Sequence, residues 1–241
     1  MRNFEKEVSS RIDFIQHMLK NSGADGIVFG SSGGKDSVLV GILCKLACTN
    51  TLAVIMPCES SQNYGQDKDD AIILAENFDI ETIVIDLTKT KKEIVLAIDP
   101  NVNVSKNGNV NIAPRLRMTT LYTIAASKNY LVAGTGNLSE TYMGYFTKWG
   151  DGACDFNPIS DLSVTEIFEF LKHLKVPNQF YTKAPSPGLY EGQTDELEMG
   201  VSYDEIDQYL LNGKIGQNFT KIIKANRTTE HKRNPISKFR S

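Results

Sequence analysis

The residues with the clearest chemical capacity lie in a glycine-rich stretch, GSSGGKDS, at residues 30–37. Glycines let backbone N–H groups approach an anion closely, and the N-terminus of a following helix adds partial positive charge. An apolar, strand-forming run precedes this stretch, and an apolar segment of helical period follows it. In open α/β sheets, ligands bind at the carboxyl ends of strands, which is where such a turn would lie. The stretch therefore predicts a cradle for phosphate groups.

Known glycine-rich motifs match this stretch to different degrees. The Walker A pattern G-x-x-x-x-G-K-[ST] fails, because the spacing from Gly30 to Lys35 is one residue too short and Asp36 follows the lysine. The dinucleotide-binding pattern G-x-G-x-x-G also fails here. The nucleophile elbow G-x-S-x-G does match residues 30–34, which makes Ser32 a candidate hydrolase nucleophile.

Asp36 distinguishes between the two interpretations of this stretch, a phosphate cradle and a nucleophile elbow. A carboxylate inside a triphosphate site would repel the ligand unless a divalent cation lay between them, and Mg²⁺ is usually held by one or two carboxylates together with substrate phosphates. The elbow gives Asp36 no role. It also needs a histidine, for which His173 in an amphipathic segment and His231 in a basic segment are poor candidates. The sequence favours a nucleotide bound as its metal complex, with a serine hydrolase as the alternative.

The elements that must position this stretch are short apolar runs that alternate with longer segments of helical period. The expected strands cover residues 26–30, 52–56, 82–87 and 130–133. The expected helices cover residues 4–20, 36–48, 67–78 and 114–127. Continuous apolar runs indicate strands buried on both faces, and repeated β-then-α order is typical of a parallel sheet. We expect one domain over residues 1–241. Its predicted class is α/β, a single doubly wound (Rossmann-like) parallel sheet flanked by helices, with a helical C-terminal third.

The C-terminal third has its own helix signals. Two capping boxes, Ser163 with Glu166 and Ser202 with Glu205, predict the starts of helices. From residue 214 onward basic residues dominate, interleaved at helical spacing with the apolar residues Ile215, Phe219, Ile222 and Ile223. This pattern indicates an amphipathic helix with a solvated basic face and not a nucleic-acid tail.

The composition excludes several classes of protein. The chain has 241 residues and a mass of 26.8 kDa, with 41% hydrophobic and 23% charged residues, which is typical of a globular protein and not of a disordered, collagenous or disulfide-rich one. No apolar run reaches the roughly 18 residues that span a bilayer, and the N-terminal residues lack the apolar core of a signal peptide. The four cysteines fit a reducing compartment. We expect a cytoplasmic protein that binds neither membrane nor nucleic acid.

The glycine-rich loop resembles that of a known family. SGGKDS at residues 32–37 is similar to the S-G-G-x-D-S pyrophosphate loop of the N-type ATP pyrophosphatases, which cleave ATP between the α and β phosphates and adenylate a substrate. On the loop alone, ammonia-dependent NAD synthetase, GMP synthetase, argininosuccinate synthetase and tRNA-modifying relatives stay open. A tRNA-modifying enzyme would need a basic RNA-binding surface, which the sequence offers only in its C-terminal tail.

Later segments favour the NAD synthetases. GTGNLSE at residues 134–140 resembles their G-T-x-N-x-S-E segment, and GYFTKWGDGACD at residues 144–155 is similar to their G-Y-F-T-K-x-G-D-G-x-x-D. Residues 185–186, 192–196 and 231–233 also resemble that family. The resemblance covers most of the chain. It implies amidation of deamido-NAD (nicotinic acid adenine dinucleotide) with ammonia and ATP, to give NAD, AMP and pyrophosphate through an acyl adenylate.

The resemblance also implies roles for individual residues. The implied ATP contacts are Gly30, Ser31, Ser32, Gly33, Gly34, Lys35, Asp36, Ser37, Thr135 and Ser186, and the implied deamido-NAD contacts are Arg115, Lys148, Asp155, His231 and Lys232. Asp36 and Glu140 would bind Mg²⁺, because Glu140 follows the end of a predicted strand at the same sheet edge as Asp36. Glu140 could equally be a helix-start carboxylate. Lys35, Asp36 and Asp155 are the predicted catalytic residues, and Asp155 would accept the proton that ammonium loses.

One position departs from the family pattern. After Asp161-Leu162 the family usually has a lysine that reaches ATP, and the matching residue in this chain is Val164. That contact must be absent or come from another cation. Lys35, at the variable position of S-G-G-x-D-S, is our hypothesis for the replacement.

The resemblance further implies a homodimer with the dinucleotide site near the interface. Because the motifs run from Ser32 to Arg233 in 241 residues, we expect no glutaminase domain. Free ammonia or a separate partner is then the nitrogen source. Residues 184–200, rich in proline, glycine and acidic residues, are a candidate lid over the acyl adenylate. A nucleotide-binding sensor without turnover is an alternative of a different class.

Overall fold

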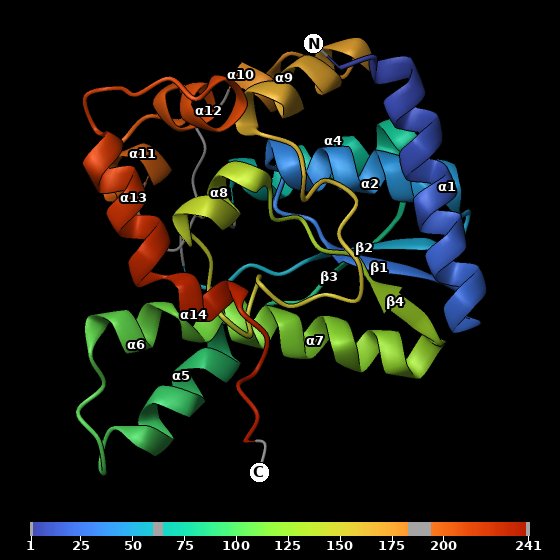
Figure 1. Ribbon diagram of the computed structural model, residues 1–241. Coiled ribbons are helices and arrows are strands. Elements are labelled where there is room, and N and C mark those ends of the chain that lie inside the picture. Colours follow the sequence, from blue (N-terminus) through green and yellow to red (C-terminus); the bar gives the residue numbers. More distant parts are fainter. Residues whose placement is uncertain (1, 60–64, 183–193, 240–241) are drawn as a thin grey trace.

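The computed structural model describes residues 2–59, 65–182 and 194–239 (Figure 1). Within these ranges, four parallel strands form one sheet of order β3-β2-β1-β4, with bounds β1 Gly26–Gly30, β2 Thr51–Ile55, β3 Glu81–Val84 and β4 Tyr130–Val132. All four predicted strands are confirmed. β3 ends before its predicted end, although Ile85 still donates to the Ile55 carbonyl at 2.9 Å and continues the pairing with the end of β2.

Helices account for most of the remaining described residues. They are α1 (Phe4–Ser22), α2 (Lys35–Ala47), α4 (Gln66–Phe78), α5 (Thr88–Ile98), α6 (Lys106–Val110), α7 (Ile112–Lys128), α8 (Leu138–Met143), α9 (Val164–His173), α10 (Gln179–Thr182), α11 (Asp195–Met199), α12 (Tyr203–Asn212), α13 (Phe219–Thr228) and α14 (Glu230–Arg233). The four helices predicted before residue 130 are confirmed as α1, α2, α4 and α7. In the part of the chain that the structure describes, no helix is long and apolar enough to cross a membrane.

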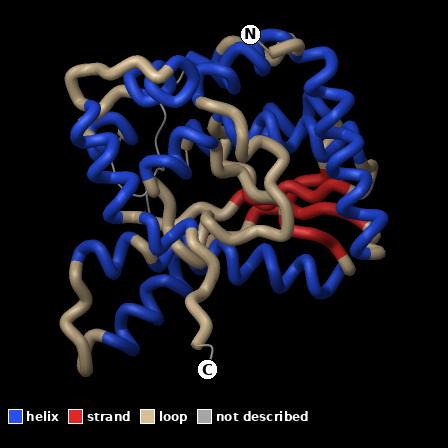
Figure 2. The backbone as a smooth tube through the Cα atoms, viewed as in Figure 1, coloured by secondary structure: helices blue, strands red, loops and turns tan. Residues whose placement is uncertain are grey.

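The sheet is covered on both faces, as its continuous apolar runs require. Ile27 and Phe29 of β1 belong to the core that packs with α1, α2 and α9, whereas Val28 belongs to the core on the α7 side. Figure 2 shows the strands enclosed between these layers of helices. The predicted α/β class with a doubly wound parallel sheet is therefore confirmed.

The strand order places a topological switch between β1 and β4. From β1 the chain proceeds outward to β2 and β3, and it then returns to β4 on the other side of β1. Connections that leave two such neighbouring strands diverge and open a crevice at their carboxyl ends, the usual ligand site of this architecture. The loop of residues 30–37 follows β1, and the loop to α8 follows β4. The two most motif-rich segments thus meet in one crevice.

The helical C-terminal third is confirmed, with changes at the starts of two helices. The capping box at the start of α9 forms as predicted. Ser202 caps α12, but Glu205 accepts hydrogen bonds from the backbone and side chain of Asn218, so the second box is only half formed. These bonds hold the residue before Phe219, where α13 begins. The amphipathic helix predicted to include Ile215 therefore begins only at Phe219, and Ile215 precedes it and is exposed.

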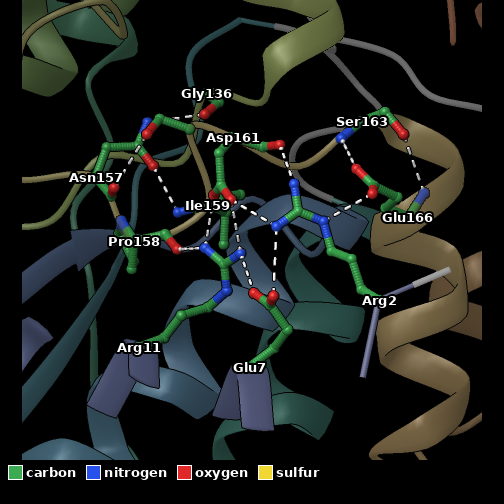
Figure 3. A network of polar contacts seen from close by, with 11 residues as sticks. Arg2, Glu7, Arg11, Gly136, Asn157, Pro158, Ile159, Asp161, Ser163 and Glu166 are labelled. Carbon is green, nitrogen blue, oxygen red and sulfur yellow. Dashed lines mark hydrogen bonds and ion pairs between the residues drawn. The ribbon is translucent and has the colours of Figure 1, made fainter. Parts of the chain in front are cut away.

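A network of ion pairs and hydrogen bonds joins α1 to the loop before α9 (Figure 3). The Arg11 guanidinium, only 8% exposed, donates to Asp161 at 2.7 and 3.0 Å and to Glu7 at 2.6 Å. In the same loop, the Asn157 side chain donates to the Gly136 carbonyl at 2.8 Å. The N-terminal helix is thereby linked to the segment that follows β4.

A buried carboxylate, Asp207 of α12, fixes the starts of α8 and α9. It is 2% exposed, and it accepts hydrogen bonds from the Ser139 hydroxyl at 2.5 Å and from the Thr165 N–H and hydroxyl at 2.8 and 2.7 Å. Ser139 in turn accepts from the Val164 N–H at 3.2 Å. Because Glu140 is the next residue of α8, this cluster sets its position.

Asp161→Asn tests the network of Figure 3 through its pH dependence. Burial alone would raise the pKa of Asp161, but hydrogen bonds and charge from Arg11, together with Arg2, lower it below the ordinary value. The stability that a lowered pKa contributes is present above the ordinary carboxyl pKa of about 4 and is lost as the pH falls through the lowered value. We expect Asp161→Asn to reduce the free energy of unfolding by about 1 kcal/mol near neutral pH, a small value because this side chain is half-exposed.

Urea unfolding at about pH 7 and about pH 3 measures this effect, since the second value lies below the ordinary carboxyl pKa. The difference between wild type and Asp161→Asn should shrink in acid. Asp13→Asn, exposed on the same helix, is the matched control and should change stability little at either pH. An Asp161→Asn effect that stays constant in acid would contradict the ion-pair explanation.

Asp207→Asn should destabilise the chain more strongly, because both carboxylate oxygens face donors and an amide nitrogen would oppose at least one of them. We expect a loss of about 2–3 kcal/mol in the free energy of unfolding, measured by urea denaturation. Asp204→Asn, exposed in the first turn of the same helix, is the control. Its loss should stay below about 1 kcal/mol, the usual range for a carboxylate near a helix N-terminus. Equal effects in the two variants would contradict the role of Asp207.

Candidate functional site

A cavity of about 790 Å³ lies at the carboxyl ends of β1, β2 and β4, a volume within the usual range of small-molecule sites. Its walls come from residues 30–37, from α7, from the segment between residues 133 and 151, and from α11 and α14. Segments that are distant in sequence meet here because the chain diverges at the topological switch and opens a crevice that these segments line. Most residues that the resemblance implied as ligand contacts line this one cavity.

The loop after β1 has the conformation that a phosphate cradle needs. Gly33 has a φ of 71°, a left-handed backbone that favours glycine, and it turns the chain into α2 without lining the cavity itself. Gly34 is the N-cap of α2 and offers no side chain to bond the first N–H groups, which leaves them free to bind an anion. The Ser37 hydroxyl closes the turn by donating to the Gly34 carbonyl at 3.0 Å.

Ser31, at the start of the same loop, holds an unsatisfied polar group. The side chain is buried and lines the cavity, and its hydroxyl oxygen has no hydrogen-bond partner among the described residues. Buried polar groups are nearly always paired, so an unpaired one beside a cavity indicates a place for a ligand atom.

At the start of α2, Lys35 and Asp36 meet Glu140 of α8. The Lys35 ammonium lies 2.7 Å from Asp36 Oδ2 and 3.9 Å from Glu140 Oε1, and the lysine is only 6% exposed. Asn137 donates to the other oxygen of Asp36 at 3.1 Å. The structure thus brings together the two carboxylates that the sequence predicts as metal ligands, and it adds an ammonium between them.

Glu140 has the helix-start role that its place in the sequence allowed, and its role as a metal ligand stays a prediction. Its Oε2 accepts from the Asn137 N–H at 3.3 Å, and its own N–H donates to Asn137 Oδ1 at 2.9 Å, which forms a capping box for α8. Its other oxygen faces Lys35. Burial and the charge of Asp36 raise the pKa of Glu140 well above its ordinary value, although Lys35 opposes that shift.

Two further residues join this cluster that sequence reasoning did not assign to it. Asp195 of α11 lines the cavity and is 3% exposed; one carboxylate oxygen accepts from the Tyr203 hydroxyl at 2.6 Å, and the other has no partner among the described residues. The Lys35 ammonium lies 5.5 Å from the centroid of the Tyr203 ring. Asp195 belongs to the family-like segment 192–196, but only the fold brings it next to the glycine-rich loop.

The donor set fits one hard cation when nucleotide phosphates complete the site. Among the described residues, no group of three or more His, Cys, Asp and Glu side chains could hold a metal ion by itself. Asp36 and Glu140 nevertheless converge on one positive charge, the Lys35 ammonium. Two carboxylates, with phosphate oxygens and water at the remaining positions, are a usual ligand set for Mg²⁺.

The opposite end of the cavity is basic. The Arg115 Nε donates to the Lys148 carbonyl at 3.3 Å, and the Lys148 ammonium donates to the His231 carbonyl at 2.6 Å. Lys232 donates to two backbone carbonyls of the segment after α8, each at 2.7 Å. Burial, together with the charges of Arg233 and Arg115, lowers the pKa of Lys232, although the charge of Asp151 opposes that shift. Four of the five residues implied as deamido-NAD contacts therefore lie together.

Asp155 is the fifth, and it is not among the residues that line the cavity. Its two oxygens accept from the Val132 N–H at 2.8 Å and from the Tyr122 hydroxyl at 3.1 Å, which ties β4 to α7. Its contact with substrate and its role as proton acceptor stay predictions. Thr135, by contrast, lines the cavity. Ser186 and the first part of the candidate lid, residues 184–193, lie outside the described residues.

Val164, where the family usually has a lysine, is 2% exposed and does not line the cavity. It belongs to an apolar cluster that includes Tyr203. The Lys35 ammonium lies over the ring of Tyr203, a member of the same cluster.

Ser32 lacks the partners of a hydrolase nucleophile. Its hydroxyl oxygen lies 3.2 Å from the Ser37 hydroxyl, and no contact among the described residues joins it to a histidine. His173, the last residue of α9, packs near the ring of Phe4 in α1, with ring centroids 5.9 Å apart. His231 belongs to the basic end of the cavity. This geometry disfavours the hydrolase alternative.

Comparisons with known proteins agree with the site. The chain matches the NAD synthase family over residues 7–240. It is 42% identical over 235 residues to the NH(3)-dependent NAD(+) synthetase of Carboxydothermus hydrogenoformans, with 96% of each chain covered. It is 41% identical over 248 residues to that of Archaeoglobus fulgidus, with 99% of this chain and 98% of the relative covered.

Solved structures give the same result. The NMN synthetase of Francisella tularensis matches with a TM-score of 0.93 and 34% identity, covering 99% of both chains. The NH3-dependent NAD synthetase of Campylobacter jejuni matches with a TM-score of 0.82 and 31% identity, covering 100% of both chains. The chain therefore belongs to the NAD synthase family.

Proposed function

We propose that this chain amidates deamido-NAD with ammonia and ATP, and releases NAD, AMP and pyrophosphate. Members of the NAD synthase family are ATP-dependent ligases that catalyse this reaction. The observation that carries the assignment is a single cavity with a phosphate cradle at one end and a basic group at the other. Such a cavity suits two nucleotides whose reacting groups meet between its ends.

The cradle end supports ATP as the co-substrate. The phosphates would lie on the N–H groups at the start of α2, beside the unpaired hydroxyl of Ser31. An apolar wall of the same cavity offers a surface for the adenine ring, formed by Val54, Met56, Met118 and Leu121. Asp36 and Glu140 would hold Mg²⁺, which when bound supplies positive charge for the phosphate oxygens.

The basic end supports the second nucleotide. Deamido-NAD carries a pyrophosphate and a carboxylate, and Arg115, Lys148 and Lys232 supply donors and positive charge for such groups. Trp149 lines the same end and is 58% exposed. We propose that a second copy of the chain covers this end, as a homodimer.

The reaction needs placement and charge stabilisation more than a protein nucleophile. An oxygen of the nicotinate carboxylate bonds to the α-phosphorus of ATP, the bond from that phosphorus to the bridging oxygen breaks, and pyrophosphate leaves. The α2 N–H groups and the Lys35 ammonium would stabilise the charge that pyrophosphate gains. The nitrogen of ammonia then bonds to the carbonyl carbon, AMP leaves, and the nitrogen loses a proton.

A mononucleotide is a second candidate substrate. The backbone agrees more closely with the F. tularensis NMN synthetase, at a TM-score of 0.93, than with the C. jejuni NAD synthetase, at 0.82. Nicotinate mononucleotide carries the same carboxylate and one phosphate but lacks the adenylate half of deamido-NAD. The basic end of the cavity offers suitable donors for either molecule.

We also propose a single-domain chain that works in the cytoplasm with free ammonia as nitrogen source. The family match over residues 7–240 supports one domain. Cys44, Cys48, Cys58 and Cys154 are free thiols, which supports a reducing compartment. The relatives are named for their dependence on NH3, which supports ammonia without a glutaminase partner.

Incubating the full chain with ATP, Mg²⁺, ammonium and either deamido-NAD or nicotinate mononucleotide tests the function. We expect AMP and the matching amide in equal amounts, measured by chromatography. A kcat/KM about tenfold or more higher with deamido-NAD supports an NAD synthetase, and the reverse supports an NMN synthetase. ATP binding without turnover would support a sensor, and ester cleavage lost in Ser32→Ala would support a hydrolase; either result contradicts the proposal.

Lys35→Gln tests whether Lys35 replaces the cation that Val164 cannot supply. In buffer with EDTA, we expect ATP to bind about tenfold more weakly, because a charge-assisted contact to a phosphate is lost. Isothermal titration calorimetry measures the affinity. Lys45→Gln removes a lysine at the far end of the same helix, where it pairs with Asp79, and should leave the affinity unchanged. An unchanged ATP affinity in Lys35→Gln would refute the replacement.

A further inference from the structure

The Lys35 ammonium stands where the carboxylates of Asp36 and Glu140 converge. Its distances of 2.7 and 3.9 Å to these groups are those of ion pairs, and its side chain is almost completely buried. A lysine ammonium is a compact point charge at the end of a flexible stem of four carbons. It can therefore fill a cation position and also leave it.

The single positive charge of Lys35 does not balance the negative charges of the carboxylates around this position. Three carboxylates lie in the cluster, those of Asp36, Glu140 and Asp195, and Asp195 has one buried oxygen without a partner among the described residues. Buried charges are stable only when they are paired or bind a metal. The unpaired oxygen is an independent sign that the cluster accepts more positive charge than one ammonium.

Lys35 and a divalent cation cannot occupy this position together. Mg²⁺ binds carboxylate oxygens at about 2.0–2.1 Å, which would place the ion between Asp36 and Glu140, in the space that the ammonium fills. Two cations at such separation repel strongly at low dielectric. Binding of the metal therefore requires Lys35 to move, and the nearest new anions would be the phosphates on the loop at the start of its own helix.

We propose that Lys35 is a tethered counter-ion that holds the cation position between Asp36 and Glu140 in the nucleotide-free chain, so that a divalent cation enters when nucleotide phosphates draw Lys35 away. In this role Lys35 makes the metal and ATP bind cooperatively. It rests on the proposed function only in taking the nucleotide to be ATP. By linkage, ATP must raise the affinity for the metal by the same factor as the metal raises the affinity for ATP.

Titration of the full chain with Mn²⁺, followed by electron paramagnetic resonance, tests the proposal without catalysis. In the absence of nucleotide we expect Lys35→Gln to bind Mn²⁺ about tenfold or more tightly than wild type, because the competing charge is gone. Lys35→Arg keeps the charge and should not gain affinity. Lys45→Gln, at the far end of the same helix, is the surface control and should match wild type.

The stability of the variant gives a second readout. In EDTA, Lys35→Gln should melt at a lower temperature than wild type, because its carboxylates are left without a cation, and Mn²⁺ should restore its melting temperature by mass action. Wild type should show little shift with Mn²⁺ alone. Adding α,β-methylene-ATP to wild type should raise the affinity of the chain for Mn²⁺. This measurement does not depend on whether a variant folds.

Two results would overturn the proposal. One is a Mn²⁺ affinity of Lys35→Gln equal to or below that of wild type, and the other is tight Mn²⁺ binding by wild type that α,β-methylene-ATP does not change. Neither measurement depends on amide formation. A chain that shows the expected Mn²⁺ behaviour but makes no NAD or NMN would contradict the proposed function and leave the role of Lys35 intact.

Discussion

The charge balance between the Lys35 ammonium and the carboxylates around it is the interaction on which the cavity depends. Asp36 comes from the start of α2, Glu140 from α8, and Asp195 from α11, far along the chain. Three carboxylates in one place, one buried and two partly buried, would repel one another and lose much of their hydration. An ammonium placed among them lets the chain fold with its binding groups already assembled. The same arrangement keeps the site ready for a ligand that brings its own positive charge.

Polar contacts from distant helices hold these groups in place. α8 spans only Leu138–Met143, and so short a helix is not stable by itself. Its capping residue Asn137 bonds to both Glu140 and Asp36, and Asp207 of α12 bonds to Ser139 within it. The position of Glu140 is therefore set by α12 and by the loop after β1 together. This explains why the cavity forms only in the complete fold and not from the β1–α2 unit alone.

Local signals in the sequence predict the fold well, whereas the site depends partly on tertiary placement. The strands and the phosphate loop follow from apolar runs and from glycine next to a helix start, which act over a few residues. Glu205 was predicted to complete a capping box, but Asn218, far along the chain, binds it. The sequence also does not show that the oxygens of Asp155 accept hydrogen bonds from the β4 backbone and from Tyr122. Asp195 reaches the cluster of Lys35, Asp36 and Glu140 only through the tertiary fold.

The lysine at the variable position of the loop and the departure from the family pattern at Val164 can be explained together. Lys35 is the first residue of α2, where a positive charge is unfavourable because it faces the positive end of the helix dipole. Helix stability therefore does not explain a lysine at this position. The neighbouring carboxylates do, since they compensate both the helix dipole and the burial of the ammonium. Val164 supplies no cation, and its apolar cluster includes Tyr203, over whose ring the Lys35 ammonium lies. One cation thus stands where it can serve the carboxylates before nucleotide binds and the phosphates afterwards.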